Sequence, residues 1–284
     1  MLTLFAFTDP VCVWCWAAEA LFRGLETHYP GAVDIHHIAS GMVKDIHVFD
    51  DPDAGLTGNQ TMDQINASIA QHYEDTAETH HMPIHTEGFR LFSEATPSSW
   101  PQNIAFKAAQ IATPQHANRF LRHVRQATMA QALPTAQAPV LYELAGICGI
   151  DQKKYAAALT DGSALKAFQQ DLRLAMENSI DLFPSYILKY QGKALRLAGH
   201  IPFQEFVKSI TKLTGGAILP QASPPEDRAL LELLHQYQTL SMEEIRQAFD
   251  FEEGSTPQAW CRRLEQAGKL RISPVGKSWM ITQA

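Results

Sequence analysis

Two cysteines three positions apart, just after an apolar opening segment, constrain this chain more than any other feature. Alternating apolar side chains predict a strand over residues 2–7, and a run with few helix breakers predicts a helix over residues 12–29. Cys12 therefore begins the helix and Cys15 lies one turn further on, close enough for the two sulfurs to bond. The pattern places a Cys-x-x-Cys pair at a strand-to-helix junction.

This position predicts dithiol–disulfide exchange. Backbone N–H groups at a helix N-terminus favour an anion, so we expect the Cys12 thiolate to be stabilised, with a pKa below the free value of ~8.5. Cys12 is expected to be exposed and to attack, whereas Cys15 is expected to be half buried and to resolve the mixed disulfide. The cysteine pair would itself be the redox group, with no other cofactor and no metal.

Two other interpretations of the pair are a zinc site and inert core cysteines. Structural zinc needs four nitrogen or sulfur ligands and usually a second Cys pair, but Cys148 and Cys261 stand alone in the sequence. Redox chemistry is therefore the favoured interpretation. Cys148 lies on an apolar helix face and is expected to be buried and inert, while Cys261, next to Arg262, is expected to be the more reactive of the two.

Two segments of the chain resemble one known family. Residues 9–16 read DPVCVWCW and residues 183–188 read FPSYIL. They resemble the two signatures of DsbA-like thioredoxin-fold proteins, in particular the branch described as dithiol–disulfide isomerases, which carries DPxCxWC. The resemblance covers about residues 1–213. Val13 and Trp14 stand where strongly oxidising members have Pro-His, and oxidation, reduction and isomerisation are all compatible with the pattern.

The resemblance also implies roles for residues around the pair. In that family a cis-proline packs beside the active-site disulfide, which implies a cis Phe183–Pro184 bond next to Cys12, with Pro184 binding substrate and shielding the disulfide. A cis bond is cheap only before proline, and a strand that starts there leaves the backbone of Phe183 free to pair with a substrate. Trp14, between the cysteines, is expected to contact substrate as well.

The order of predicted elements fits a thioredoxin fold with a large helical insertion. Residues 33–39 predict a second strand, so the chain opens as a β-α-β unit. Residues 44–60 predict a loop rich in Asp, Gly and Pro. Helices are predicted at 61–80, 101–112, 115–131, 139–148, 151–159, 163–179 and 202–213, and a hairpin at 184–190 and 193–198. We therefore predict a DsbA-like α/β domain over residues 1–215, with the insertion at about 60–160.

A small second domain is predicted over residues 222–284, after a linker rich in Gly, Pro and Ser. Helices at 227–237, 241–249 and 256–267, followed by short strands at 269–273 and 278–282, resemble a winged helix. Residues 226–284 contain seven Lys or Arg and nine Asp or Glu, a net charge of −2. Because DNA-binding domains are usually basic, contact with a protein or dimerisation is favoured over DNA binding.

Composition excludes several function classes. The net charge of −7 argues against general binding to nucleic acid or to anionic membranes, because both depend on a surplus of Lys and Arg. No run approaches the ~20 apolar residues of a membrane span. No basic region precedes the apolar opening, and cleavage of a signal peptide would destroy the cysteine motif, so we expect a cytoplasmic protein.

Histidines form the other conspicuous group. His72, His80, His81 and His85 lie close together in the sequence, but neighbouring positions on a helix point apart and no ligand spacing repeats. They are expected to be solvated surface residues.

The prediction is a thiol–disulfide oxidoreductase or isomerase that acts through Cys12 and Cys15 on a substrate protein or on a small-molecule disulfide such as that of glutathione. One alternative is an enzyme like the kappa-type glutathione transferases and isomerases, which commonly use a single Ser or Cys. Another is a redox-responsive regulator whose C-terminal domain binds DNA or protein. The oligomeric state stays open.

Overall fold

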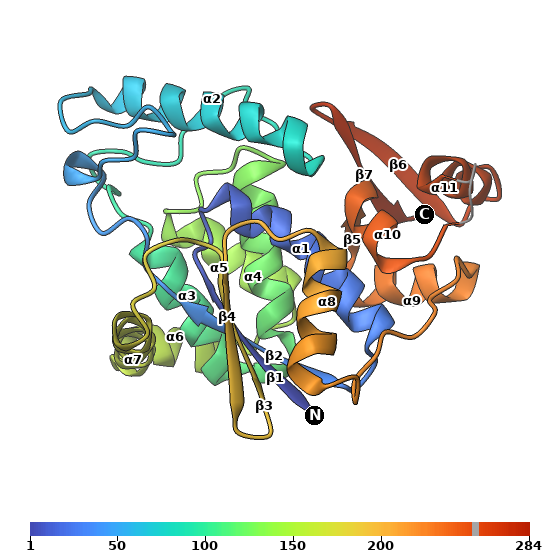
Figure 1. Cartoon of the computed structure of the whole chain (residues 1–284). Helices are drawn as coiled ribbons and strands as arrows, with labels where there is room; N and C mark the ends of the chain where they lie inside the picture. The colour runs from blue at the N-terminus through green and yellow to red at the C-terminus, as the bar shows by residue number, and fades with distance from the viewer. Residues whose placement is uncertain (252–255) are drawn as a thin grey trace.

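The computed structural model describes residues 1–251 and 256–284, and a four-stranded mixed sheet lies at its centre (Figure 1). The strands run in the order β2-β1-β3-β4: β1 (Leu2–Thr8), β2 (Val33–Ala39), β3 (Ser185–Tyr190) and β4 (Lys193–Ala198). β1 pairs parallel with β2 and antiparallel with β3, which forms an antiparallel hairpin with β4. The chain therefore has the strand arrangement predicted for a thioredoxin fold.

Side-chain alternation along β1 gives the sheet two apolar faces. Leu4 and Ala6 share a core with α1 (Val13–His28) and α8 (Phe203–Thr214). Phe7 belongs to a separate cluster that includes Ala175 of α7 (Ser163–Glu177). Helices thus cover both faces, and the carboxyl end of β1 leads directly into α1.

The predicted helical insertion is present between β2 and α7. After the short turn η1 (Ile46–Val48), its helices are α2 (Met62–His80), α3 (Trp100–Ala112), α4 (Pro114–Met129), α5 (Ala138–Ile147) and α6 (Gln152–Thr160). Helices α3 to α7 share one hydrophobic core, whereas α2 packs in a second core with the segment that follows it and with residues next to the cysteine motif. Helix α2 therefore packs against residues at the start of α1.

The C-terminal module comprises α9 (Asp227–Tyr237), β5 (Thr239–Ser241), α10 (Met242–Ala248), α11 (Pro257–Gln266), β6 (Leu270–Val275) and β7 (Ser278–Gln283). Its strands form an antiparallel sheet in the order β5-β7-β6. The three predicted helices and the hairpin are present, and Ser241 and Glu244 form the capping box of α10. Strand β5 was not predicted, because three residues are too few to show a period. The winged-helix interpretation stays a prediction.

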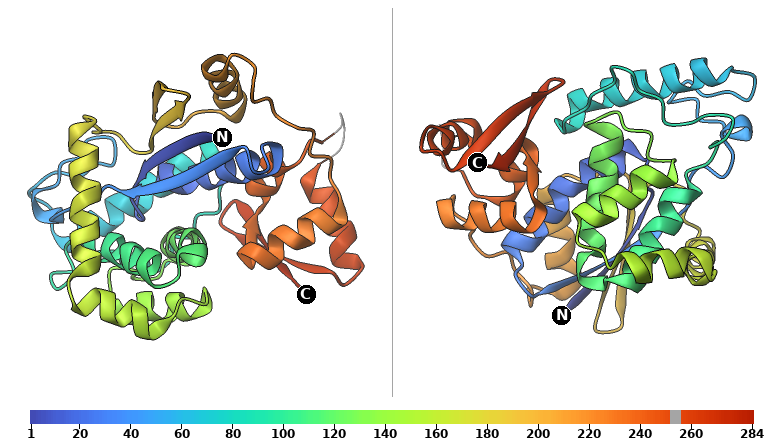
Figure 2. Two further views of the ribbon diagram at one scale, coloured as in Figure 1. Left: turned by 90° about the horizontal axis from the view of Figure 1, so that it is seen from below. Right: turned by 180° about the vertical axis from the view of Figure 1, so that it is seen from behind.

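The C-terminal module packs directly against α1 (Figure 2). The segment predicted as a linker is fixed by hydrogen bonds: the Gln221 N–H donates to the His28 carbonyl at 2.7 Å, and the Ser223 hydroxyl donates to the Ala248 carbonyl at 2.8 Å. No helix in the described ranges is both long and apolar enough to cross a membrane.

Candidate active site

The structure brings Cys12, Cys15 and the Phe183–Pro184 bond together at the carboxyl end of β1. Cys12 is the N-cap of α1, and its carbonyl accepts hydrogen bonds from the Cys15 and Trp16 N–H groups at 3.0 and 3.1 Å. The Phe183–Pro184 peptide bond is cis, and the Cys12 Sγ lies 3.7 Å from the Phe183 carbonyl oxygen. Pro184 is buried, and its carbonyl accepts from the Gly199 N–H at 2.8 Å.

Both cysteines are more deeply buried than predicted. Cys12 is 6% exposed and Cys15 is fully buried, whereas the sequence led us to expect an exposed Cys12 and a half-buried Cys15. The segment around Phe183, more than 170 positions further along the chain, lies against the Cys12 sulfur. Contacts so distant in sequence leave no signal in the motif itself. Cys12 therefore keeps only a small exposed surface.

The reduced pair shares its protons unequally. Burial raises the pKa of the Cys12 thiol well above its usual value, and a hydrogen bond with Cys15 raises it further. Burial also acts to raise the pKa of Cys15, but the hydrogen bond from Cys12, the charge of Arg125 and a hydrogen bond with Thr8 outweigh it and lower that pKa. The predicted lowering of the Cys12 pKa is therefore wrong for this conformation, because the favourable charge and hydrogen bonds converge on Cys15.

The groups that stabilise the Cys15 thiolate form a buried chain. Arg125 of α4 is fully buried and donates a hydrogen bond to the Thr8 hydroxyl oxygen, so the hydroxyl hydrogen of Thr8 is free to point at Cys15. The same guanidinium forms an ion pair with Glu19 of α1. We did not predict these residues from the sequence, because β1, α1 and α4 meet only in the folded chain.

These side chains belong to a larger network of buried charges that reaches the C-terminal module. Arg122 donates two hydrogen bonds to the Glu244 carboxylate, at 2.7 and 2.6 Å, and both side chains are fully buried. Arg23 lies 3.5 Å from Glu19 and 3.6 Å from Glu244 and thereby joins the two carboxylates. Ion pairs thus connect α10 to the residues behind Cys15.

Asp9 fixes the loop that carries Cys12. Its buried carboxylate accepts hydrogen bonds from the Val11 N–H at 3.0 Å, the Met42 N–H at 2.7 Å, the Ser99 hydroxyl at 3.1 Å and the Asn103 amide at 2.8 Å. Burial raises the pKa of Asp9 despite these bonds. The aspartate of the DPVC segment therefore ties the cysteine loop to the segment after β2 and to α3.

Trp14 stands between two histidines. Its ring centroid lies 5.8 Å from that of His80, in an edge-to-face arrangement, and 5.5 Å from that of His200. His80 is only 4% exposed and burial lowers its pKa to about 3, so the prediction of a solvated His80 is wrong. The C-terminal end of α2 folds over the cysteine motif and buries this ring. Trp16 is fully buried.

A groove opens beside Cys12, with a volume of about 420 Å³. Trp14 and Phe183, the two residues predicted to bind substrate, line it together with Cys12. Its other walls come from the 42–56 loop, α2, residues 91–92 and the segment 181–183. This cavity, the Cys12 groove, is large enough for a small molecule or for a few side chains of a peptide.

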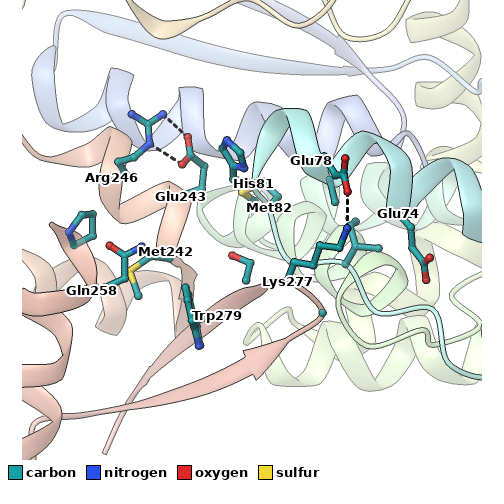
Figure 3. Close-up of a pocket in the computed structure, with 15 residues that line it drawn as sticks. Glu74, Glu78, His81, Met82, Met242, Glu243, Arg246, Gln258, Lys277 and Trp279 are labelled. Atoms are coloured by element: carbon teal, nitrogen blue, oxygen red, sulfur yellow. Dashed lines mark hydrogen bonds and ion pairs between the residues drawn. The ribbon is translucent and has the colours of Figure 1, made fainter.

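A larger cavity of about 750 Å³ lies away from the cysteines, between α2 and the C-terminal module (Figure 3). Ion pairs between Lys277 and Glu78 and between Arg246 and Glu243 border it. At the edge of this cavity, the turn at Gly276 lies against the segment that follows α2. A Cβ added to Gly276 would lie 2.0 Å from the Ile84 carbonyl oxygen. This cavity shares no residue with the Cys12 groove.

The two remaining cysteines are poorly placed for chemistry. Both are fully buried, and burial raises the pKa of Cys148 and of Cys261 to about 12. Cys148 matches its prediction, whereas the expected reactivity of Cys261 is wrong, because the side chain points into the core of the C-terminal module rather than toward Arg262. Within the described residues no group of three or more His, Cys, Asp or Glu is arranged to hold a metal ion.

Comparison with known proteins identifies the family. A family model described as thioredoxin matches residues 5–208, most of the chain. The chain belongs to this thioredoxin family. Its fold resembles a candidate protein disulfide isomerase from Nitrosomonas europaea, with 16% identity, a TM-score of 0.62, and coverage of 74% of this chain and 96% of the other. It also resembles the cytosolic disulfide reductase DsbM from Pseudomonas aeruginosa, with 20% identity, a TM-score of 0.57, and coverage of 75% and 100%.

The fold is therefore that of a DsbA-like thioredoxin protein, as the two sequence signatures predicted. Proteins similar in sequence have names that describe an adapter rather than a disulfide enzyme. The chain is 25% identical over 283 residues to the ClpXP adapter protein SpxH from Halalkalibacterium halodurans. The aligned region covers 98% of this chain and 88% of that protein. This similarity includes the C-terminal module as well as the thioredoxin domain.

Proposed function

We propose that this protein is a thiol–disulfide oxidoreductase that works through Cys12 and Cys15. One observation carries the proposal: a Cys-x-x-Cys pair lies at the N-terminus of α1, with the sulfur of Cys12 facing the Phe183 carbonyl at the end of an open groove. Trp14, Phe183 and Pro184 form the surroundings in which a substrate sulfur would meet Cys12.

The chemistry proceeds in two exchanges. Cys12 passes its proton to Cys15, and the Cys12 thiolate attacks one sulfur of a substrate disulfide. A Cys12–substrate bond forms, the substrate S–S bond breaks, and the first substrate sulfur takes the proton from Cys15 and leaves as a thiol, so that Cys15 is again a thiolate. The Cys15 thiolate then attacks the Cys12 sulfur and releases the second substrate sulfur, which takes a proton from solvent. The pair is oxidised to a disulfide and the substrate is reduced to two thiols; the reverse sequence oxidises a substrate.

The surroundings of Cys15 suit the resolving step. Arg125 and Thr8 stabilise negative charge on Cys15, and a thiolate is the form of cysteine that attacks a disulfide. Transfer of the proton along the hydrogen bond between the two cysteines would place the charge on either sulfur in turn.

Single-cysteine variants test the proposal. The assay follows multiple turnover of a quenched fluorescent peptide disulfide, with glutathione as the recycling thiol. We expect C12S to lose activity, C15S to accumulate a mixed disulfide detectable by mass spectrometry, and C148S, which changes a buried cysteine outside the site, to retain wild-type turnover. Full multiple turnover by C15S would contradict the proposal and favour a transferase that needs only one thiol.

A second candidate function is that of an adapter for ClpXP. The observation that favours it is the similarity to SpxH adapters over 98% of this chain, the C-terminal module included. The cavity between α2 and the C-terminal module offers a contact surface separate from the cysteines. The two functions are compatible, because the two surfaces share no residue.

Sedimentation of the full-length protein with purified ClpXP tests this second candidate. An adapter should co-sediment with the protease, and the C12S/C15S variant should do so equally well if binding is independent of the redox pair. Absence of co-sedimentation, with a known adapter as positive control, would remove the candidate.

A further inference from the structure

The Cys12 groove combines apolar walls with an acidic rim. Its floor and sides include Val43, Ile46, Leu56, Phe92 and Phe183. Four carboxylates border it: three on the loop after η1 and one in the segment before the cis bond, at positions Asp50, Asp51, Asp53 and Asp181. We call these four the acidic rim. Two chain segments more than 120 residues apart thus bring negative charge to the same opening.

The acidic rim is not neutralised locally. Neither Asp50 nor Asp53 forms an ion pair with any residue in the described part of the chain, and both side chains are exposed. Asp181 lies 3.6 Å from Arg196, but its side chain is 89% exposed, and such exposed pairs contribute little. Among the described residues, no Lys or Arg lines the groove.

We propose that the Cys12 groove selects a cationic peptide disulfide, one with Lys or Arg beside an apolar residue close to the reacting cysteine. This inference rests on the proposed redox function and names its substrate class. The apolar walls would take the apolar side chain, and the acidic rim would take the basic one, since complementary charges favour association and like charges oppose it.

The same charges disfavour glutathione disulfide. Each half of that molecule carries carboxylates at both ends and a single ammonium group, so it is a net anion at neutral pH. A groove that recognises it needs a cation for those carboxylates, and the described lining contains no Lys or Arg; its basic side chain is that of His72. The chemistry is the two-step exchange described above, with the cationic peptide as the disulfide that is reduced and the protein dithiol as its reductant.

Single-turnover kinetics with the pre-reduced full-length protein test this selection. Three quenched peptide disulfides share one apolar flanking residue and differ only in carrying two Lys, two Glu or two Ser; glutathione disulfide is the fourth probe. At low ionic strength the Lys peptide should react about tenfold or more faster than the Glu peptide, and salt should shrink the ratio because exposed charges are screened.

Matched variants separate the rim from the overall charge of −7. D50N/D53N should bring the ratio of Lys-peptide to Glu-peptide rates close to one. D34N/E143Q removes the same number of charges outside the groove, at positions that do not line it, and should keep the wild-type ratio. The salt dependence of the wild-type ratio needs no variant, so the test stands even if D50N/D53N folds poorly.

The outcomes are distinct. Equal rates for the three peptides, or faster reaction with the Glu peptide or with glutathione disulfide, would overturn the selection while leaving the redox function intact. No reaction with any probe, in wild type and C12S alike, would overturn the proposed function and the selection with it. A ratio that falls equally in D34N/E143Q would assign the effect to net charge and overturn the role of the rim.

Discussion

Replacing Glu244 by Gln tests whether buried charge holds the C-terminal module to the thioredoxin domain. Gln keeps the shape of the side chain and is compatible with a capping box with Ser241, so the variant removes the charge and one of the two acceptor oxygens. Arg122 would lose one of its two hydrogen bonds, and Arg23 would lose a negatively charged partner 3.6 Å away. Removing one partner of a fully buried pair costs about 3–5 kcal/mol, and we expect the free energy of unfolding at pH 7 to fall by about that amount.

The pH dependence gives the sign of the effect. Burial acts to raise the pKa of Glu244, but Arg122 and then Arg23 outweigh it and lower the pKa from 4.5. A carboxylate with a lowered folded pKa stabilises the fold above its unfolded pKa, and this stabilisation is lost as pH falls through the folded value. The difference between wild type and E244Q should therefore be full at neutral pH and shrink below about pH 4.5.

Urea unfolding at several pH values, followed by circular dichroism, measures both effects. E232Q makes the same chemical change on the exposed face of α9 and should leave the stability unchanged. A loss below about 1 kcal/mol for E244Q at pH 7 would contradict a buried ion pair between Arg122 and Glu244, because breaking such a pair costs about 3–5 kcal/mol. A difference that does not vary between pH 7 and pH 3 would refute the assignment to the Glu244 charge.

Three further predictions follow from the site and its surroundings. Arg125→Met should raise the pKa of the first thiol to ionise, seen as an upward shift of the thiolate absorbance titration, whereas Arg125→Lys should keep more of the effect; no shift in R125M would contradict the role given to this charge. Cys148 and Cys261 should react with a thiol reagent only on unfolding, because both are buried with a pKa of about 12, and fast labelling of either in the native protein would be inconsistent with the structure. Gly276→Ala should lower the unfolding temperature, because a φ of +55° is strained for Ala and the added Cβ would lie 2.0 Å from a backbone oxygen. Gly268→Ala is the control, because Gly268 also has a positive φ but has open space where its Cβ would be. Equal losses of unfolding temperature in the two variants would argue against the close contact at Gly276.

Local patterns were enough to predict the thioredoxin core. Alternation predicted the strands around the cysteines, breakers divided the helices, and the DPVCVWCW and FPSYIL segments identified the partners that meet at the site. Each of these signals involves residues close together in the sequence. The element types were therefore right even where their ends differ from the structure by a residue or two.

The electrostatics of the site could not be predicted in the same way. The lowered pKa at Cys15 depends on Arg125, and the burial of Cys12 depends on Phe183, both more than a hundred positions away. The preference of helix N-termini for anions predicted the negative charge on Cys12. This preference takes no account of the buried Arg125 guanidinium, which favours the charge on Cys15. His80 was mistaken for a surface residue for the same reason: the packing of α2 over Trp14 exists only in three dimensions.

The redox equilibrium of the Cys12–Cys15 pair tests the proposed thiol–disulfide centre most directly. The full-length protein is equilibrated in glutathione buffers of graded potential, alkylated, and analysed by peptide mass spectrometry. We predict one reversible two-electron transition, in which each ~30 mV changes the equilibrium constant tenfold. It should be confined to the peptide that carries Cys12 and Cys15 and be absent in C12S. A pair that stays reduced at every potential, or a transition that survives in C12S, would contradict the assignment of this site as a thiol–disulfide centre.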